Sequence, residues 1–515
     1  MSENGLRDTK DEGYGGPPHP GRRDGPDPGV ALDVLARETA VPRPGNGSEH
    51  SPAGRKGSGR RAVFWLWAVL LAQGVFFALI QPVWSRVDEA QHFHFVQFIV
   101  EDQALPVAGR TFISPEVMEV SLARNQWSWR PAGMLSTPAY LDPDSWITVP
   151  PELDERESEK WIRRNLWRFN YEAMQPPLYY MVNAPVYAAL PDNSFVRLYG
   201  MRLLAALMAS AMVPVAYLMA REAFPDSRLV VYGTPAVVLM TQGYALNMSQ
   251  VTNDALAIPL AAASILVLLR MVSRGLSWKR SLLAGGLAGA SMLAKLTAVF
   301  LLPLALLAPA VLLAYHREKL KRVLVHAGVM MVVPASLLAP WLVRNLAVYG
   351  DPTGSNAAQP LMSSFFRTPT SSLETLRMEE LFPTYWFGEP VYSFGFWAPA
   401  GIGIGLAMAL AVAGLLHYFF GRDHRQVPDV HICVTFLAFA LLIGVAVNLV
   451  IPFMSGIGGV PGRYLYPLMP VIAFLLVFGI DRLLRRERAR FVVETLLVWI
   501  IVWESINVLS YVKNL

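Results

Sequence analysis

AVFWLWAVLLAQGVFFAL, residues 62–79, is an apolar run without a single charged side chain. A helix that spans a bilayer needs about 20 consecutive, mainly apolar residues, and this run reaches that length with its flanks. Comparable runs with few or no charges recur along the chain, at Ile258–Leu269, Leu282–Leu293, Ala298–Leu313 and Leu468–Ile480. The sequence therefore predicts an all-α protein that crosses a membrane many times.

The composition agrees with a membrane protein. The chain has 515 residues, of which 53% are hydrophobic and 16% charged, whereas about 25% charged residues is usual for soluble domains. The single cysteine, Cys433, excludes an intramolecular disulfide and any cysteine-based zinc site. The net charge of +5 does not call for a nucleic-acid partner, because the Lys and Arg residues flank hydrophobic segments, where they set membrane topology.

The N-terminal segment differs from the rest of the chain. Residues 1–60 are rich in Gly, Pro, Arg, Asp and Ser and lack periodic apolar residues, which predicts a disordered tail before a transmembrane domain at 61–515. The tail is not a signal peptide, because its first apolar run begins only at Ala62. The basic stretch RKGSGRR, residues 55–61, directly precedes that run and predicts a cytoplasmic tail.

Clusters of Lys and Arg orient the remaining helices. If these clusters face the cytoplasm, the turns between them face outward, with large outer loops at 82–176 and 344–396. The short apolar segment 177–190 is expected to be re-entrant or interfacial, because a full crossing there would invert every later loop. Of the 11–12 helices that we expect to span a bacterial plasma membrane, eleven are placed near 62–81, 198–220, 229–243, 254–273, 281–294, 297–314, 323–342, 397–420, 431–451, 464–481 and 491–511.

The richest polar cluster follows the first span, in WSRVDEAQHFHF, residues 84–95. Asp88 and Glu89 lie where the chain leaves the membrane, and an acidic residue at a membrane edge is a candidate for function. Such a carboxylate can accept a proton from a hydroxyl group or hold a divalent metal ion through oxygen ligands. The structural alternative is a charge placed favourably at a helix N-terminus.

This cluster resembles the first outer loop of GT-C-type glycosyltransferases, which are multi-spanning enzymes that use polyprenyl-phosphate-linked sugars. Protein O-mannosyltransferases, bacterial aminoarabinose transferases and a poorly characterised bacterial family that resembles this chain more closely belong to them. Further stretches resemble the family's motifs in the family's order, namely QPPLYY (175–180), TNDA (252–255), LAKLT (293–297), PWLVRN (340–345), YGDP (349–352) and GRYLYP (462–467). The topology derived from charge independently places all of these polar features on the outer side.

The resemblance implies a role for each polar residue. Asp88 becomes the catalytic base, and Glu89 either orients it or binds an acceptor or a metal ion. A divalent cation stays open as a cofactor, with Asp88, Glu89 and Asp254 as candidate ligands. The residues expected to bind substrate are His92, Gln175, Asp254, Lys295, Arg344, Arg463 and Tyr464.

Structural alternatives accompany these roles. Lys295, Arg344 and Arg463 are candidates to hold the donor's phosphate, because fixed cations stabilise developing phosphate charge. Lys295 could instead extend to the membrane interface, and the two arginines could pair with loop carboxylates. Asp254 could serve as a helix N-terminal charge, and His92 could be a structural histidine.

The expected activity is an inverting transfer of a hexose or pentose to a glycan, lipid or protein acceptor on the extracytoplasmic face. Inversion is implied by the resemblance alone. A flippase or transporter for a lipid-linked sugar is the first alternative, but it predicts charges spread through the bilayer depth. A non-catalytic membrane protein in envelope assembly is the second alternative, and the Asp88–Glu89 pair argues against it.

Overall fold

The structure is a computed structural model that describes most of the chain as α-helices. The described residues are 55–84, 88–108, 110–123, 170–354, 378–388, 398–421, 428–450, 461–484 and 486–513, and these ranges contain no β-strand. The predicted tail up to residue 54 and the inner parts of both predicted outer loops lie outside them. The prediction of an all-α, polytopic membrane protein is confirmed.

Each of the eleven predicted spans coincides with a helix or with consecutive helices. These elements are α2 (Arg55–Ile80), α7 (Ser194–Ser210) with α8 (Met212–Ala223), α9 (Arg228–Met240) with α10 (Gln242–Met248), α11 (Asp254–Arg274), α12 (Trp278–Ala294), η5 (Leu296–Phe300) with α13 (Leu301–His316), α14 (Leu320–Tyr349), α18 (Ala398–Phe420), α19 (Pro428–Val445) with η8 (Ala446–Val450), η9 (Gly462–Leu468) with α21 (Met469–Leu483), and α22 (Arg486–Lys513).

Within the described ranges, eight helices are long and apolar enough to cross a membrane, or nine if α9 and α10 form one span bent by 56°. The predicted number of 11–12 is larger because it includes α12 and α22. The 17 residues of α12 form a helix about 25 Å long, somewhat shorter than a hydrocarbon core of about 30 Å. Helix α22 is long enough, but its first turns are rich in arginine and glutamate.

Burial separates central from peripheral helices. The apolar windows of α11 and of η9–α21 are 78% and 72% buried, whereas those of α2 and α14 are only 22% and 28% buried. Helix α11 packs against α7, α8, α12 and α13, and α21 packs against α8, α9 and α18. The exposed leucines and valines of α2 and α14 are suited to lipid rather than water, because their helices lack an opposite polar face.

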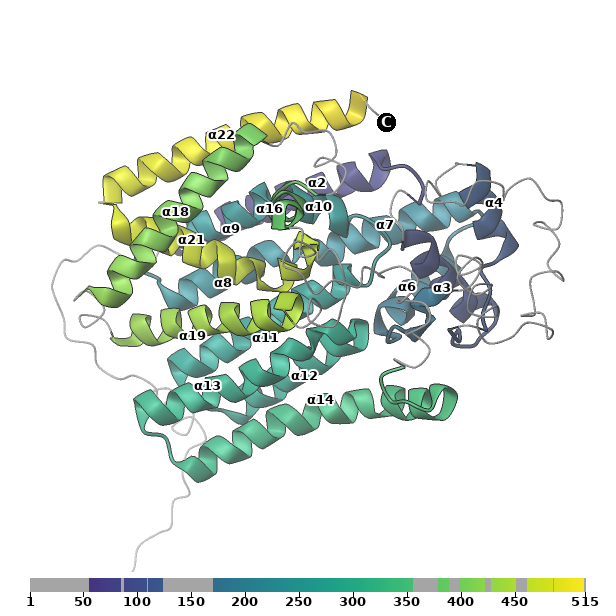
Figure 1. The fold of residues 1–515 in the computed structure, drawn as a ribbon, viewed down its shortest axis with the longest axis horizontal. Coiled ribbons are helices and arrows are strands. Elements are labelled where there is room, and N and C mark those ends of the chain that lie inside the picture. The colour runs from purple at the N-terminus through teal and green to yellow at the C-terminus, as the bar shows by residue number, and fades with distance from the viewer. Residues whose placement is uncertain are drawn as a thin grey trace, which may run out of the picture. The chain divides into compact units, whose positions relative to one another are not determined.

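Residues 58–515 form one compact unit, and a group of short elements lies beside its long helices at one end, on the right in Figure 1. It consists of α3 (Glu89–Glu101), α4 (Pro115–Ala123), η4 (Tyr171–Met174) and α6 (Leu178–Ala189). With 12 residues, α6 is about 18 Å long, too short to cross a bilayer, and it packs against α3, α7 and α12. That segment 177–190 is re-entrant or interfacial stays a prediction, with which this short length is compatible.

The first helix begins earlier than the sequence suggested. The predicted tail extends to residue 60, but α2 already begins at Arg55 and includes the basic stretch before the apolar run.

Candidate functional site

The centre of the site is Asp88, which occupies the N-cap position of α3. Its Oδ1 accepts a hydrogen bond of 2.9 Å from the hydroxyl of Tyr171, and its Oδ2 lies 3.6 Å from Nη2 of Arg463. The Asp88 side chain keeps 31% of its surface exposed. A carboxylate that is held on one side and open on the other is placed to meet a substrate hydroxyl.

The surroundings keep Asp88 ionised. Burial by itself raises the pKa of this carboxyl, but the charges of Arg463 and Lys295 and the hydrogen bond from Tyr171 outweigh it. The pKa of Asp88 is therefore lowered from its ordinary value of 3.8. At neutral pH the group carries its full negative charge and can accept a proton.

Arg463 reaches Asp88 from η9, which is anchored by its neighbours. The backbone N–H of Gly462 donates to Oγ1 of Thr384 at 2.8 Å, and the hydroxyl of Tyr466 donates to the carbonyl of Tyr385 at 3.0 Å. Both partners belong to α16 (Met378–Trp386). Gly462 is required at this contact, because a Cβ there would overlap the backbone of α16.

A second ion pair lies close to the first. Lys295 is the C-cap residue of α12, and its Nζ lies 2.7 Å from Oδ1 of Asp254, the first residue of α11. Both side chains are largely buried, with 16% and 10% exposure. The charge of Lys295 acts on Asp88, and a small cavity joins Asp88 to Asp254 and Arg463. Four predicted residues from four parts of the chain therefore meet in one place.

Glu89 has a different environment from that of Asp88. Its carboxylate forms hydrogen bonds of 2.8 and 2.6 Å with Nε and Nη2 of Arg202, and its Oε1 also accepts the N–H of Val251 at 3.1 Å. Neither the Glu89 nor the Arg202 side chain is exposed. This buried ion pair fits the first role that the resemblance implies for Glu89, which is to orient Asp88, and the catalytic role of Glu89 stays a prediction.

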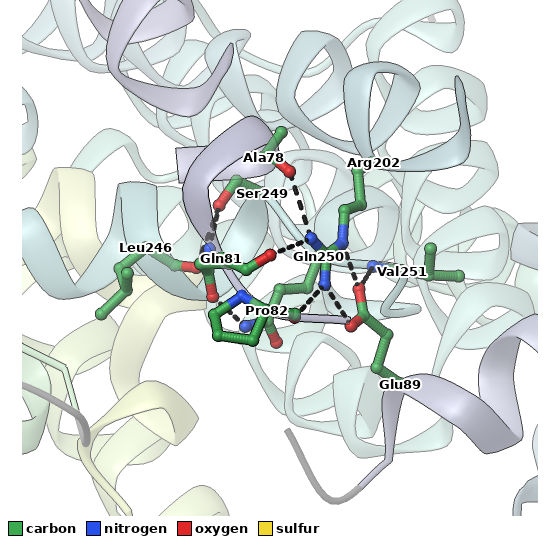
Figure 2. A network of polar contacts seen from close by, with 9 residues as sticks. All are labelled: Ala78, Gln81, Pro82, Glu89, Arg202, Leu246, Ser249, Gln250 and Val251. Carbon is green, nitrogen blue, oxygen red and sulfur yellow. Dashed lines mark hydrogen bonds and ion pairs between the residues drawn. The ribbon is translucent and has the colours of Figure 1, made fainter. Parts of the chain in front are cut away.

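Arg202 connects Glu89 to the end of α2, as Figure 2 shows. Its guanidinium also donates to the carbonyl oxygens of Ala78, Gln81 and Pro82, at 2.7–3.1 Å. The amide of Gln81 continues the network by donating to the carbonyl of Leu246 at 3.0 Å and to Ser249 at 2.8 Å. The end of α2 and the two residues that follow it, Gln81 and Pro82, are thus fixed to α7 and α10.

The two histidines of α3 are buried and have hydrogen-bond partners within the protein. His92 Nδ1 lies 2.9 Å from the hydroxyl of Tyr180, and His94 Nδ1 lies 3.0 Å from Nδ2 of Asn170. Burial lowers the pKa of His92 to about 4 and that of His94 to about 3. His92 does line the cavity beside Asp88, so its predicted contact with substrate stays a prediction, but it is uncharged there.

Arg344 is less central than expected. It donates to the carbonyl of Pro106 at 2.7 Å and to the hydroxyl of Tyr349 at 3.2 Å, and it lies over the ring of Trp341. Arg344 thus ties the segment after α3 to the end of α14, and among the described residues no contact links it to Asp88. These contacts fit the structural alternative, and the predicted phosphate contact of Arg344 stays a prediction.

Gln175 and Tyr464 complete the predicted set. Gln175 Oε1 accepts a hydrogen bond of 3.3 Å from Asn253, beside Asp254, so it borders the site. Tyr464 follows Arg463 on η9 and is partly exposed, and its predicted contact with substrate stays a prediction.

The three carboxylates proposed as metal ligands do not form a metal site. Asp88 pairs with Arg463, Glu89 with Arg202, and Asp254 with Lys295. Within the described residues, no group of three or more His, Cys, Asp or Glu side chains is arranged to hold a metal ion. A divalent cation needs several free oxygen ligands, and here each carboxylate already has its own cationic partner.

Two site residues, Tyr171 and Glu172, were not predicted. They form η4, immediately before the QPPLYY stretch, and Tyr171 bonds directly to Asp88. Burial and the charge of Asp88 raise the pKa of Glu172 to about 8, against the charges of Lys295 and Arg463. The only signal in the sequence was an acidic residue three positions before Gln175, and nothing in the pattern linked it to Asp88.

Comparisons with known proteins agree with the sequence-based assignment. Residues 176–343 match the family model described as dolichyl-phosphate-mannose-protein mannosyltransferase. This match supports the predicted resemblance to GT-C glycosyltransferases, and it contains Asp254 and Lys295 but neither Asp88 nor Arg463. No curated protein matches the chain.

Solved structures of two proteins are similar to the chain. An oligosaccharyltransferase from Archaeoglobus fulgidus has 11% sequence identity and a TM-score of 0.48, over 86% of this chain and 56% of that protein. The chain thus spans little more than half the length of that relative. ArnT from Cupriavidus metallidurans, solved bound to undecaprenyl phosphate, has 14% identity and a TM-score of 0.32, over 82% of this chain and 77% of ArnT.

Proposed function

We propose that this chain is a GT-C-type membrane glycosyltransferase, which transfers a sugar from a polyprenyl-phosphate-linked donor to an acceptor at the extracytoplasmic face. The family match of residues 176–343 supports this proposal. One observation carries this proposal. The ionised, partly exposed carboxylate of Asp88 lies beside Arg463 and within electrostatic reach of Lys295. A base next to two cations is what transfer from a phosphate-linked sugar requires.

The reaction follows from this arrangement. Asp88 takes the proton of the acceptor's hydroxyl group, and the acceptor oxygen attacks the anomeric carbon of the sugar. The bond between that carbon and the phosphate oxygen breaks, and the electron pair leaves with the lipid phosphate. Arg463 and Lys295 stabilise the negative charge that develops on the phosphate. Attack opposite the leaving group inverts the anomeric configuration.

The contacts of Arg463 and Lys295 also support their proposed role in binding the phosphate of the donor. Arg463 lies 3.6 Å from Asp88, which is longer than a charge-assisted hydrogen bond of about 2.8 Å. Lys295 is bonded to Asp254, and an ammonium group has two further protons to donate.

Sugar transfer in vitro tests the proposal. Purified protein is given labelled polyprenyl-phosphate hexoses and pentoses together with a crude envelope acceptor. We expect the wild type to transfer label from one of these donors, and Asp88→Asn to be about 10²–10⁴-fold slower with unchanged donor binding. The panel also identifies whether a hexose or a pentose is moved.

Asp192→Asn is the matched control. Its side chain is 91% exposed and pairs with Arg197 in the turn before α7, so this change is expected to leave transfer intact. A wild type that binds the donors but transfers none, or that moves the intact lipid donor across a vesicle membrane, would support the transporter alternative instead. Full activity in Asp88→Asn would show that another group is the base.

A further inference from the structure

A groove of about 830 Å³ is lined by residues of α2, α9, α21 and α22 and of the turn before α9. Helix α9 packs against both α21 and α22 (Figure 1). Ala62 near the start of α2 lines the groove, whereas Asp88 follows the other end of α2. Asp481 near the end of α21 lines it too, whereas Arg463 precedes the start of α21. The groove therefore lies at the opposite end of these helices from the candidate functional site.

The lining of the groove changes from charged to apolar along the helices. Asp226 and Arg228 stand at the start of α9, and Arg490 stands in the first turns of α22. Further along, the lining is apolar or aromatic as far as Ala236 on α9 and Leu497 on α22. Arg228 and Ala236 are separated by about 12 Å of helix, close to the roughly 15 Å of hydrocarbon in one leaflet. A molecule with a charged end and an apolar body one leaflet long matches this groove.

The α2 side of the groove carries apolar side chains that are exposed. Trp65 is 65% exposed and Val69 is 45% exposed, and both line the groove. The apolar window of α2 is only 22% buried, which suits a helix in contact with lipid. Tryptophan is enriched where hydrocarbon meets headgroups, which agrees with a headgroup one turn away at the start of the apolar run. Acyl chains of the bilayer can therefore reach the groove from its side.

The charged end of the groove is held in shape by buried hydrogen bonds. Ser227 is the N-cap of α9, and its Oγ accepts the N–H of Val230 at 3.3 Å and donates to Oδ1 of Asp481 at 3.0 Å. The Asp481 side chain is 1% exposed, and its Oδ2 lies 2.7 Å from Nη2 of Arg482. The start of α9 is thus joined to the end of α21. A ligand finds this end preformed and does not have to order it.

The remaining charges at this end include both signs. Arg490 is paired with Glu494, and Asp481 is paired with the arginine that follows it. Asp226 and Arg228 line the groove and are exposed, and neither forms an ion pair with any residue that the structure describes. A headgroup that offers a phosphate to Arg228 and an amine to Asp226 complements these two charges. A purely anionic headgroup would instead leave a negative charge facing Asp226.

We propose that this groove binds one phosphatidylethanolamine molecule. Its phosphate contacts Arg228, its ammonium group contacts Asp226, and an acyl chain lies along α9 and α22 as far as Ala236 and Leu497. The bound lipid fills the space between α2 and the paired helices α9 and α22. A primary ammonium group donates hydrogen bonds to a carboxylate, whereas the quaternary ammonium of choline has no proton to donate. Asp226 therefore selects ethanolamine over choline, and this selection does not depend on the proposed enzymatic function.

Lipid titration of the full-length protein tests the proposal. The protein is purified in a mild detergent, stripped of lipid, and titrated with phosphatidylethanolamine, phosphatidylcholine or phosphatidylglycerol that carry the same acyl chains. Native mass spectrometry counts the lipids bound to each chain. We expect one phosphatidylethanolamine, bound at least about tenfold more tightly than either of the other lipids, as for one added hydrogen bond between charged groups. Equal affinities, or tighter binding of phosphatidylglycerol, would overturn the proposal.

Substitutions at the charged end separate the two headgroup contacts. Asp226→Asn should lower the affinity for phosphatidylethanolamine to that for phosphatidylcholine, and Arg228→Gln should weaken the binding of both lipids. Asp429→Asn is the matched control, because Asp429 is an exposed carboxylate in the first turn of α19 and does not line the groove. It should keep the preference of the wild type. If Asp226→Asn also keeps this preference, Asp226 does not bind the amine and the proposal is wrong.

A substitution in the apolar part tests the position of the acyl chain. Ala236→Phe places a ring in the groove, and we expect it to abolish the binding of the single tight lipid while circular dichroism shows an unchanged helix content. If the folded variant binds phosphatidylethanolamine as tightly as the wild type, the lipid lies elsewhere and the proposal fails. It also fails if the stripped wild type takes up no phospholipid and dimerises, because a second copy would then cover the groove.

Discussion

Replacing Arg202 by methionine is expected to remove about 3–5 kcal/mol from the free energy of unfolding. The guanidinium is fully buried and makes five hydrogen bonds, two to Glu89 and three to backbone carbonyls at the end of α2. Methionine fills a similar volume but donates no hydrogen bond. The variant therefore leaves a carboxylate without its cation in a site from which water is excluded.

The expected loss of about 3–5 kcal/mol follows from leaving the buried Glu89 carboxylate without its cation. An intact buried ion pair adds little net stability, because desolvation cancels much of its attraction, but the loss of one partner is strongly destabilising. Arg202→Met should thus cost far more than the double variant Arg202→Met/Glu89→Leu, in which neither charge remains. The two single changes should be non-additive by about 1–3 kcal/mol, as expected for directly bonded residues.

Unfolding by denaturant in mixed micelles, followed by tryptophan fluorescence, measures these differences. Arg274→Met is the matched control, since Arg274 is also bonded to a glutamate, Glu222, but is 60% exposed. Glu222 is largely buried but keeps Arg270 and Ser273 as partners, so the loss of the exposed Arg274 is expected to cost only about 0–1 kcal/mol. The reasoning is refuted if Arg202→Met is no less stable than Arg274→Met, or if the double variant loses the sum of its single changes.

Two further predictions concern the site. Tyr171→Phe removes a hydrogen bond that lowers the pKa of Asp88, so the pKa of Asp88 should rise. The acidic limb of the pH profile of kcat/KM should therefore move to higher pH. If this limb does not move, Asp88 is not the titrating base. Lys295→Met should raise the KM for the donor roughly 10- to 100-fold, as expected for the loss of a charge-assisted hydrogen bond. Lys279 is an exposed lysine in the first turn of the same helix, α12, and Lys279→Met should leave this KM unchanged. Equal KM values for the two lysine variants would exclude a phosphate contact by Lys295.

Several parts of the site were predictable because local chemistry leaves a mark in the sequence. Asp88 stands out because a charged residue follows an apolar span, where charge is costly. Lys295 stands out for the same reason, between two apolar runs. The basic clusters also ordered the turns correctly enough to place Asp254 and Arg463 at the same end as Asp88, where the structure joins them.

The individual roles were less predictable, because they depend on partners far away in the chain. Glu89 and Asp88 are adjacent and chemically similar, yet Arg202, 113 residues beyond Glu89, buries one of them and leaves the other open. Arg344 resembles Arg463 in sequence context, but its contacts with Pro106 and Tyr349 direct it elsewhere. A residue's neighbours in sequence do not fix which groups satisfy its hydrogen bonds.

The sequence by itself determined that the chain is a bundle of membrane helices with polar residues collected in the turns at one end. The hydrophobic effect and the cost of charge in lipid act on each segment separately, so composition and order are sufficient. The tertiary structure alone decided which carboxylate is partly exposed beside Arg463, which is buried in an ion pair with Arg202, and which has a raised pKa. These properties depend on burial and on charges brought together from distant segments, and such long-range contacts arise only when the helices pack.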